Sequence, residues 1–229
     1  PILASPSFAL QNTVATNDMG PDGYNWAQAG PRGPIVVDGF GKLIALAETV
    51  GGSHAITYSN DSGATWADAL ALGFLTRGAA AYNTADDRLE VCWTAQAAAD
   101  GILYRRYAPT RDGSNNITAW SVVGASYCQL DAEVTGTMQY EHPAILWLND
   151  AAYGAHGAII CAWCCRNTGL GGTGNEIRAA MRILSNTAAD ILPVNWTHIG
   201  IASASTIGNA PLSASYTALL ANATTGIPH

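Results

Sequence analysis

The stretch Ser59-Asn60-Asp61-Ser62-Gly63-Ala64-Thr65-Trp66 decides how the rest of the chain is interpreted. It directly follows a strand-like run at residues 54–58, and its short polar residues are typical of a tight turn. Asp61 can accept hydrogen bonds from nearby backbone N–H groups, and Gly63 can adopt positive φ at little cost. Trp66 opens the next strand, where we expect its indole to fill the gap between stacked sheets. The stretch therefore predicts a hairpin turn followed by an aromatic anchor.

Short apolar runs separated by Gly, Asn, Asp and Pro turns continue along the chain, without helical periodicity. Three such runs, at residues 34–37, 43–48 and 54–58, precede the turn at 59–66 and a fourth follows it, so the first unit has four strands. The pattern returns in degraded form, and the later turns again reach a tryptophan, Trp120 and Trp196. Four antiparallel strands form one blade of a β-propeller, and such units must stack to bury their faces. We expect an N-terminal arm or closing strand at 1–31, blades at 32–76, 77–139 and 140–212, and an incomplete blade at 213–229 that opens with a strand-like run at 215–220.

The turn fits Ser-x-Asp-x-Gly-x-Thr-Trp at every defined position, and it resembles the Asp box of sialidases and related bacterial-neuraminidase-repeat proteins. The resemblance implies an all-β, sialidase-like β-propeller of four-stranded antiparallel blades, of which about three to four are visible in this chain. The box is a structural turn that non-catalytic propellers also carry, so it does not by itself imply an enzyme. Its defining residues here are Ser59, Asp61, Gly63, Thr65 and Trp66.

Residues just before each innermost strand of a propeller converge on one mouth of its central channel. Here those positions hold Arg32, Arg77 and the run Tyr140-Glu141-His142. The planar fork of an arginine grips a carboxylate with two bonds, so these side chains predict an anion-binding pocket. The alternative is that Arg32 and Arg77 are ordinary loop arginines, solvated or paired with acidic residues such as Glu141.

The resemblance to sialidases is closest over residues 32–66. Arg32-Gly33-Pro34 stands where the family has Arg-Ile-Pro, and a run ending in Ala47-Glu48 precedes the box, as it does in the family. The resemblance therefore implies that Arg32 is the first arginine of the triad that binds the substrate carboxylate.

The same comparison reveals departures from the catalytic pattern. Residues 49–53 contain neither the second arginine nor the acid/base aspartate that the family places in this loop. Tyr140-Glu141 is similar in chemistry to the nucleophilic Tyr–Glu pair but comes too early in the chain to match it by position. Retaining glycoside hydrolysis needs both an acid and a nucleophile. Arg32, Tyr140 and Glu141 are thus candidate catalytic residues of an incomplete set.

Composition excludes several classes of protein. The chain has 229 residues, 48% of them hydrophobic and 12% charged, which favours a sizeable core over a disordered chain. The net charge of −7 and a single lysine, Lys42, argue against a nucleic-acid partner. No apolar run reaches the roughly 20 residues that a membrane-spanning helix needs, so no membrane partner is expected. The start of the sequence shows no signal-peptide pattern.

The cysteines do not predict a disulfide framework, because their number is odd and three of them are crowded within residues 161–165. A zinc site would need a second pair of ligands, which the sequence lacks. We therefore expect buried free thiols, no metal and no cofactor, in a chain that folds in a reducing compartment. The five residues are Cys92, Cys128, Cys161, Cys164 and Cys165.

Together these features favour a glycan- or receptor-binding or assembly module without a full catalytic set. Its expected partners are a cell-surface glycan or sialylated carbohydrate and other copies or structural subunits of an assembly. The free thiols and the scarcity of lysine fit a phage or virion appendage, folded in the cytoplasm and displayed on a virion or extracellular assembly. The alternatives are an exo-sialidase or related retaining glycoside hydrolase whose remaining active-site residues lie outside this chain, and an architectural module without a ligand.

Overall fold

The computed structural model describes residues 35–48, 54–73, 77–94, 101–131, 138–167 and 174–203. The first sheet contains β1 (Ile35–Val37), β2 (Leu43–Glu48), β3 (His54–Ser59) and β4 (Ala67–Gly73). The second contains β5 (Arg77–Asn83), β6 (Arg88–Thr94), β7 (Ile102–Arg111) and β8 (Ile117–Asp131). The third contains β9 (Met138–Leu148), β10 (Ala158–Asn167), β11 (Gly174–Ile183) and β12 (Thr197–Ser203). The described residues also contain three short 3-10 helices, η2 (Ala151–Tyr153), η4 (Ala188–Ile191) and η5 (Pro193–Asn195).

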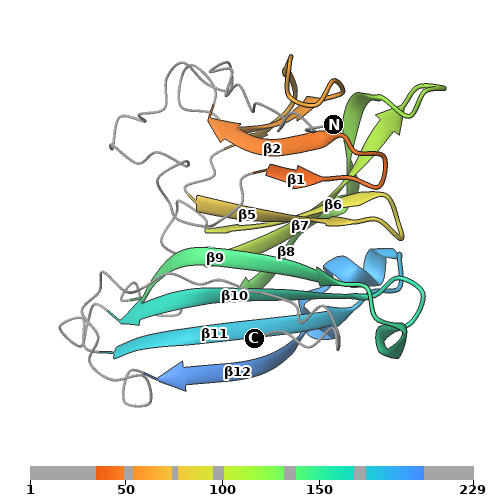
Figure 1. The fold of residues 1–229 in the computed structure, drawn as a ribbon. Coiled ribbons are helices and arrows are strands. Elements are labelled where there is room, and N and C mark those ends of the chain that lie inside the picture. The colour runs from red at the N-terminus through yellow and green to blue at the C-terminus, as the bar shows by residue number, and fades with distance from the viewer. Residues whose placement is uncertain are drawn as a thin grey trace, which may run out of the picture.

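Each sheet is an antiparallel meander in which neighbouring strands are also consecutive in the chain (Figure 1). The described residues contain no α-helix. The expectation of an all-β chain made of antiparallel units of four strands is therefore confirmed.

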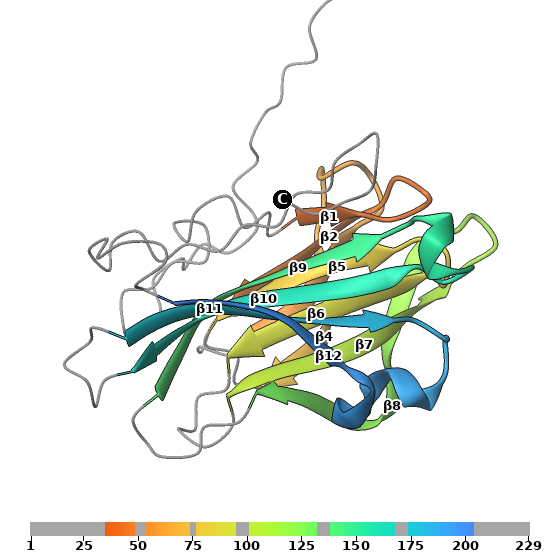
Figure 2. The same cartoon turned by 90° about the horizontal axis from the view of Figure 1, so that it is seen from below.

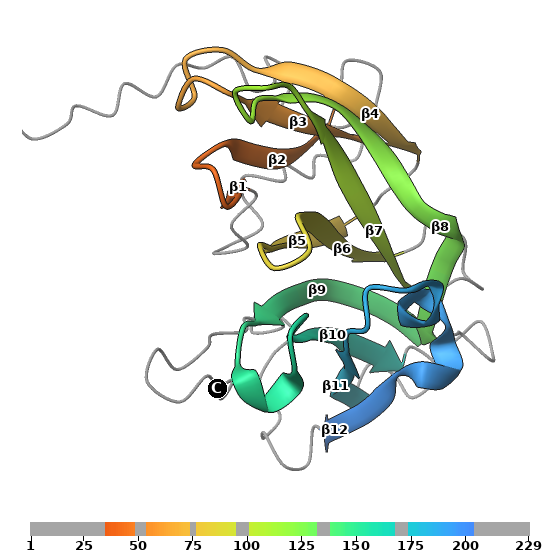
Figure 3. The same cartoon turned by 90° about the vertical axis from the view of Figure 1, so that its right-hand side faces the viewer.

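The three sheets stack through their first strands. β5 contacts β1 and β2 of the first sheet, and β9 contacts β5 and β6 of the second. Seen roughly along the strands, the sheets fan out from the side on which β1, β5 and β9 follow one another (Figure 3). The turns β1–β2 and β5–β6 and the β9–β10 connection lie together at one end, on the right in Figure 1. The first residues of β5 and β9 consequently lie at the opposite end.

Two apolar clusters fill the spaces between neighbouring sheets. Strand β6 is buried on both faces, and its side chains belong alternately to one cluster and to the other. Leu89, Val91 and Trp93 pack against the first sheet, whereas Cys92 packs against the third. Trp163 of β10 is fully buried in the cluster between the second and third sheets. Trp93 and Trp163 are thus core between the sheets, and Trp147 lies partly buried against the same cluster as Trp163.

Cys92, Cys128 and Cys161 are free and buried, as expected. Burial raises the pKa of the Cys128 thiol to about 12 and that of Cys161 well above its ordinary value. Such thiols stay protonated and unreactive at neutral pH, because the thiolate is the nucleophile. The side chains of Cys164 and Cys165 lie outside the described residues.

The β3–β4 connection forms the expected hairpin turn, held by the Asp61 carboxylate. Oδ1 of Asp61 accepts a hydrogen bond from the Thr65 backbone N at 2.8 Å, and Oδ2 accepts one from the Thr65 hydroxyl at 2.6 Å. The Ser59 hydroxyl donates to Asp61 at 2.7 Å and accepts from the Gly63 backbone N at 2.8 Å. Ser62 and Gly63 both have positive φ, which explains the short polar residue and the glycine at these positions.

The expectation that Trp66 fills the gap between sheets is wrong. Its side chain is only half-buried and belongs to neither inter-sheet cluster. A Cβ added to Gly63 would lie 4.0 Å from the Trp66 indole nitrogen, so the ring lies near its own turn. Trp120 and Trp196, which are 6% and 7% exposed, instead belong to the two inter-sheet clusters.

The β7–β8 turn repeats the hydrogen bonding of the β3–β4 turn in the next sheet. Asp112 Oδ1 accepts from the backbone N of Asn116 at 2.9 Å, and Oδ2 accepts from the Asn116 side chain at 3.0 Å. Asp61 makes the same two kinds of bond to the residue four positions further on. The place of the indole is taken by Ile117, which is buried.

The pKa of Asp61 is lowered to about 2, first by the Thr65 hydroxyl, then by the Thr65 backbone N–H and by Ser59. A depressed carboxyl pKa means that this group stabilises the fold above its ordinary pKa near 3.8 and that the stabilisation is lost as pH falls towards 2. In an NMR titration we expect the Asp61 carboxyl midpoint near 2 and a return towards the ordinary value in Thr65→Val. Thr118→Val, a threonine that bonds a backbone carbonyl, is the control. An Asp61 midpoint unchanged by Thr65→Val would contradict this account.

Candidate functional site

The predicted mouth residues fall at the end of the stack where β5 and β9 begin. Arg77 is the first residue of β5 and pairs with Thr94 of β6. Tyr140 and Glu141 pair with Cys165 and Cys164 of β10. Because β9 contacts β5, their backbones enter the same end of the stack from distant parts of the sequence. Arg32 lies outside the described residues, and the side chains of Arg77 and of Tyr140–His142 are likewise not described.

From the sequence we expect these residues just before the first strands. The structure places Arg77 and Tyr140–His142 inside the strands instead. β9 begins at Met138, so Tyr140-Glu141-His142 already belongs to the ladder. Consecutive positions of a strand belong to opposite faces of the sheet, which places the positions of Tyr140 and Glu141 on different faces. The strand geometry therefore does not favour a direct Tyr140–Glu141 pair.

A β-bulge interrupts β9 directly after Glu141. Ala144 pairs with Ala162 and Glu141 pairs with Cys164, so His142 and Pro143 together oppose one residue of β10. Proline has no N–H to give to the ladder, and a bulge is one of the few places where a strand tolerates it. Bulges are over-represented next to active sites because they change the direction of nearby side chains. The sequence indicates this feature only through Pro143.

An ion pair whose side chains are described lies at the same end. Asp131, the last residue of β8, accepts from Arg178 Nη1 of β11 at 2.8 Å. It also accepts from the indole nitrogen of Trp163 at 3.1 Å. This ion pair links the second sheet to the third, so the Arg178 charge is matched within the protein.

A buried charge network between the second and third sheets was not predicted from the sequence. Arg106 of β7 is 1% exposed and contacts three carboxylates. Its Nε lies 3.2 Å from both oxygens of Glu90, its Nη1 2.8 Å from Asp190 and its Nη2 3.2 Å from Asp86. His156 Nδ1 is 2.5 Å from the other oxygen of Asp86. Arg106 and its three carboxylates are buried, with His156 and Arg182 partly exposed at the edge, so the network holds two sheets together.

Burial raises the pKa of Glu90, and the Arg106 charge and the Tyr104 hydroxyl oppose that rise. A signal for this network exists in the sequence. Glu90 stands between Leu89 and Val91 in a strand that is apolar on both faces. A charge in such a strand needs a buried partner. Nothing local identifies Arg106 as that partner, because the pair depends on which strands stack.

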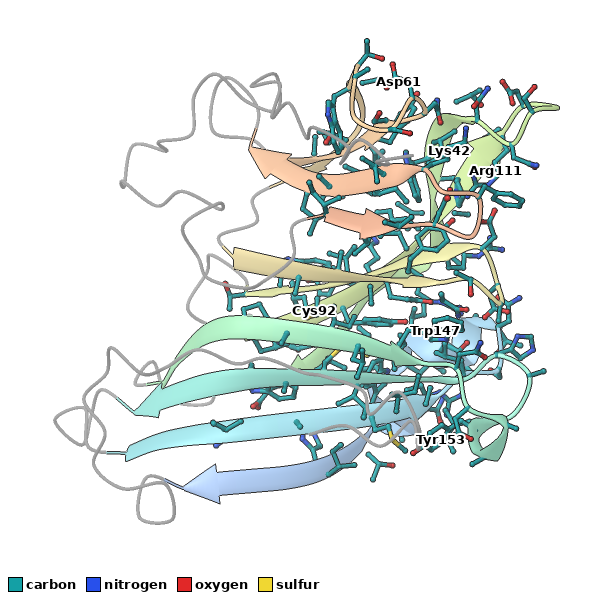
Figure 4. All side chains as sticks on the ribbon, in the orientation of Figure 1. Lys42, Asp61, Cys92, Arg111, Trp147 and Tyr153 are labelled. Atoms are coloured by element: carbon teal, nitrogen blue, oxygen red, sulfur yellow. The ribbon has the colours of Figure 1, made fainter. Side chains whose placement is uncertain are left out.

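A second set of polar contacts joins the first and second sheets and includes Lys42 and Arg111, both labelled in Figure 4. Arg111 Nη2 lies 2.8 Å from Asp38 and 2.7 Å from Asp87, and its guanidinium carbon is 4.6 Å from the centre of the Phe40 ring. Lys42 Nζ donates to the Asn116 side chain at 2.6 Å. These contacts connect the β1–β2 turn with the β7–β8 turn.

Asn60, whose position the Ser-x-Asp-x-Gly-x-Thr-Trp pattern leaves undefined, also contacts the second sheet. Its side-chain amide donates to the Ile117 carbonyl at 2.9 Å and its side-chain carbonyl accepts from the Ile117 N–H at 2.9 Å. The side chain thus imitates a paired strand residue. The turn therefore has an inter-sheet role, carried by Asn60 and not by Trp66.

Among the described residues, no group of three or more His, Cys, Asp or Glu side chains is arranged to hold a metal ion. Within the same part of the chain, no helix has the length and apolar character needed to cross a bilayer. In comparisons with known proteins, no family model matches the chain and no curated protein matches it significantly.

Proposed function

We propose that this chain forms part of a sialidase-like β-propeller that binds glycans or receptors, or mediates assembly, without a full catalytic set. The observation that carries the proposal is the repeated packing of one four-stranded meander on the next through its first strands. The succession of the sheets can be followed in Figure 1, and Figure 2 shows from below how they overlie one another. The Asp61 and Asp112 turns at the same place in two successive sheets support the Asp-box reading.

The ligand site in this proposal is the end of the stack where β5 and β9 begin. Arg77 and Arg32 supply the positive charge for a carboxylate such as that of a sialic acid, because guanidinium binds carboxylates in a fork. Tyr140, Glu141 and His142 lie near the start of β9 at this end, next to its bulge. The opposite-face positions of Tyr140 and Glu141 favour binding over turnover. The proposal includes display on a phage or virion appendage, where such a module would contact a cell-surface glycan.

Binding to a sialylated glycan array tests the proposal, with Arg77→Ala as the variant. We expect at least about tenfold weaker binding in Arg77→Ala, because a lost charged hydrogen bond is worth about 1.5–3 kcal/mol. Arg88→Ala is the matched control, because Arg88 begins the paired strand β6 at the other end of the same hairpin. Its binding should equal that of the unmodified protein.

Other outcomes separate the alternatives. Turnover of a fluorogenic sialoside that disappears in Arg32→Ala would replace the binding module with an exo-sialidase. Absence of both binding and turnover would leave the architectural module. Equal losses in Arg77→Ala and Arg88→Ala would show that the site is not at the β5–β9 end.

A further inference from the structure

The third sheet has apolar side chains buried on the face that points away from the second sheet. Leu148, Ala158 and Ile160 are 2%, 0% and 2% exposed, and Tyr153 and Met181 pack against them. They alternate along β10 with Ile159 and Cys161, which belong to the cluster shared with the second sheet. β10 is therefore buried on both faces, as a strand between two layers is.

This outer face repeats the surface on which the third sheet itself sits. β9 packs against β5 and β6, and the cluster there includes Ala79 and Ala81 of β5 and Cys92 of β6. On the outer face of the third sheet, the apolar positions again come from the first two strands. Leu146 and Leu148 lie on β9, and Ala158 and Ile160 lie opposite them on β10. The third sheet thus presents a seat for a further first strand.

The order of the chain indicates what occupies this seat. After β4 the chain enters β5 following residues 74–76, and after β8 it enters β9 following residues 132–137. Each time, the new first strand packs on the sheet just completed. β12 ends at Ser203, and the residues that follow include the strand-like run Ser215-Tyr216-Thr217-Ala218-Leu219-Leu220.

We propose that residues 215–220 form a strand that packs across Leu146, Leu148, Ala158 and Ile160, as the first strand of a fourth sheet. The proposal rests on the propeller architecture proposed above but not on glycan binding. Failure of this proposal can be told apart from failure of the glycan-binding proposal, because glycan-array binding and the packing of this face are measured separately.

Thiol labelling of the full chain tests this packing. In an Ala158→Cys variant, the introduced thiol lies on the outer face and native Cys161 lies on the inner face of the same strand, so Cys161 is an internal control. Adding Leu219→Ser and Leu220→Ser should raise the labelling rate at position 158 at least about tenfold relative to Cys161. An unchanged ratio of the two rates would overturn the proposal. The ratio is independent of global unfolding, which exposes both thiols together.

A second measurement identifies the occupant directly. Single cysteines at positions 215–220 are combined with Ala158→Cys, and a short bifunctional maleimide is used because stacked sheets lie about 10 Å apart. We expect intramolecular cross-links at alternate positions, as a strand with one face towards the sheet requires. Cross-links that join two chains would assign the seat to a second copy. Absence of cross-links at all six positions would exclude the segment, and either result overturns the proposal.

Discussion

Arg106→Met is expected to destabilise the protein by about 3–5 kcal/mol, the usual loss when one partner of a buried ion pair is removed. Arg106 lies between Glu90, Asp190 and Asp86, whose side chains are at most 1% exposed. Methionine keeps the aliphatic volume and removes only the charge and donors. Urea unfolding measures the loss. The loss should shrink as pH falls, because the unpaired carboxylates then bind protons.

Arg105→Met is the matched control for this prediction. Arg105 is the preceding residue on β7, belongs to the opposite face of the sheet and is partly exposed. Its replacement should cost well under half as much. Equal losses for the two variants, or a loss below about 1 kcal/mol for Arg106→Met, would show that the network does not hold the sheets together.

Trp163→Ala is expected to cost about 3–5 kcal/mol, the range for removing a large aromatic side chain from a core. The indole is fully buried between the second and third sheets, and its N–H bonds Asp131. Trp66→Ala should cost clearly less, about 1–2 kcal/mol, because the Trp66 side chain is only half-buried. Thermal and urea unfolding of both variants compare the two losses.

The order of these two losses is the decisive observation. A larger loss in Trp66→Ala would restore the anchor role that the Ser59–Trp66 pattern suggests. If Trp163→Ala does not fold, Trp163→Phe retains most of the ring volume and still reports the loss of the bond to Asp131.

The strands could be predicted from the sequence because their signals are local. Alternation and Gly, Asn and Asp turns mark each strand, and the Ser59–Trp66 pattern specifies its turn through contacts within eight residues. The direction of the Trp66 ring could not be predicted in the same way. It depends on how the sheets stack, and this turn bonds to the neighbouring sheet through the contact of Asn60 with Ile117. The Arg106 network could not be predicted for the same reason, since the bond between Arg106 and Asp190 joins residues 84 positions apart in sequence.

For the candidate site, the sequence predicted the chain positions of Arg77 and Tyr140–His142, and a ligand site formed by them stays a prediction. The sequence places these residues at the starts of two first strands, and the stacking of β5 and β9 brings those starts to one end. It did not reveal that β9 begins at Met138 or that a bulge follows Glu141. Strand ends depend on where the partner strand stops, and single-chain patterns carry little information about that.

The contact of Lys42 affects how this protein can be handled. It is the only lysine in the sequence, and its ammonium group bonds Asn116 and the Asn60 carbonyl where the first two sheets meet. Amine-reactive dyes, resins and sensor chips therefore have a single side chain to react with, and acylation there would remove a donor from the junction. Immobilisation through a terminal tag leaves this junction intact.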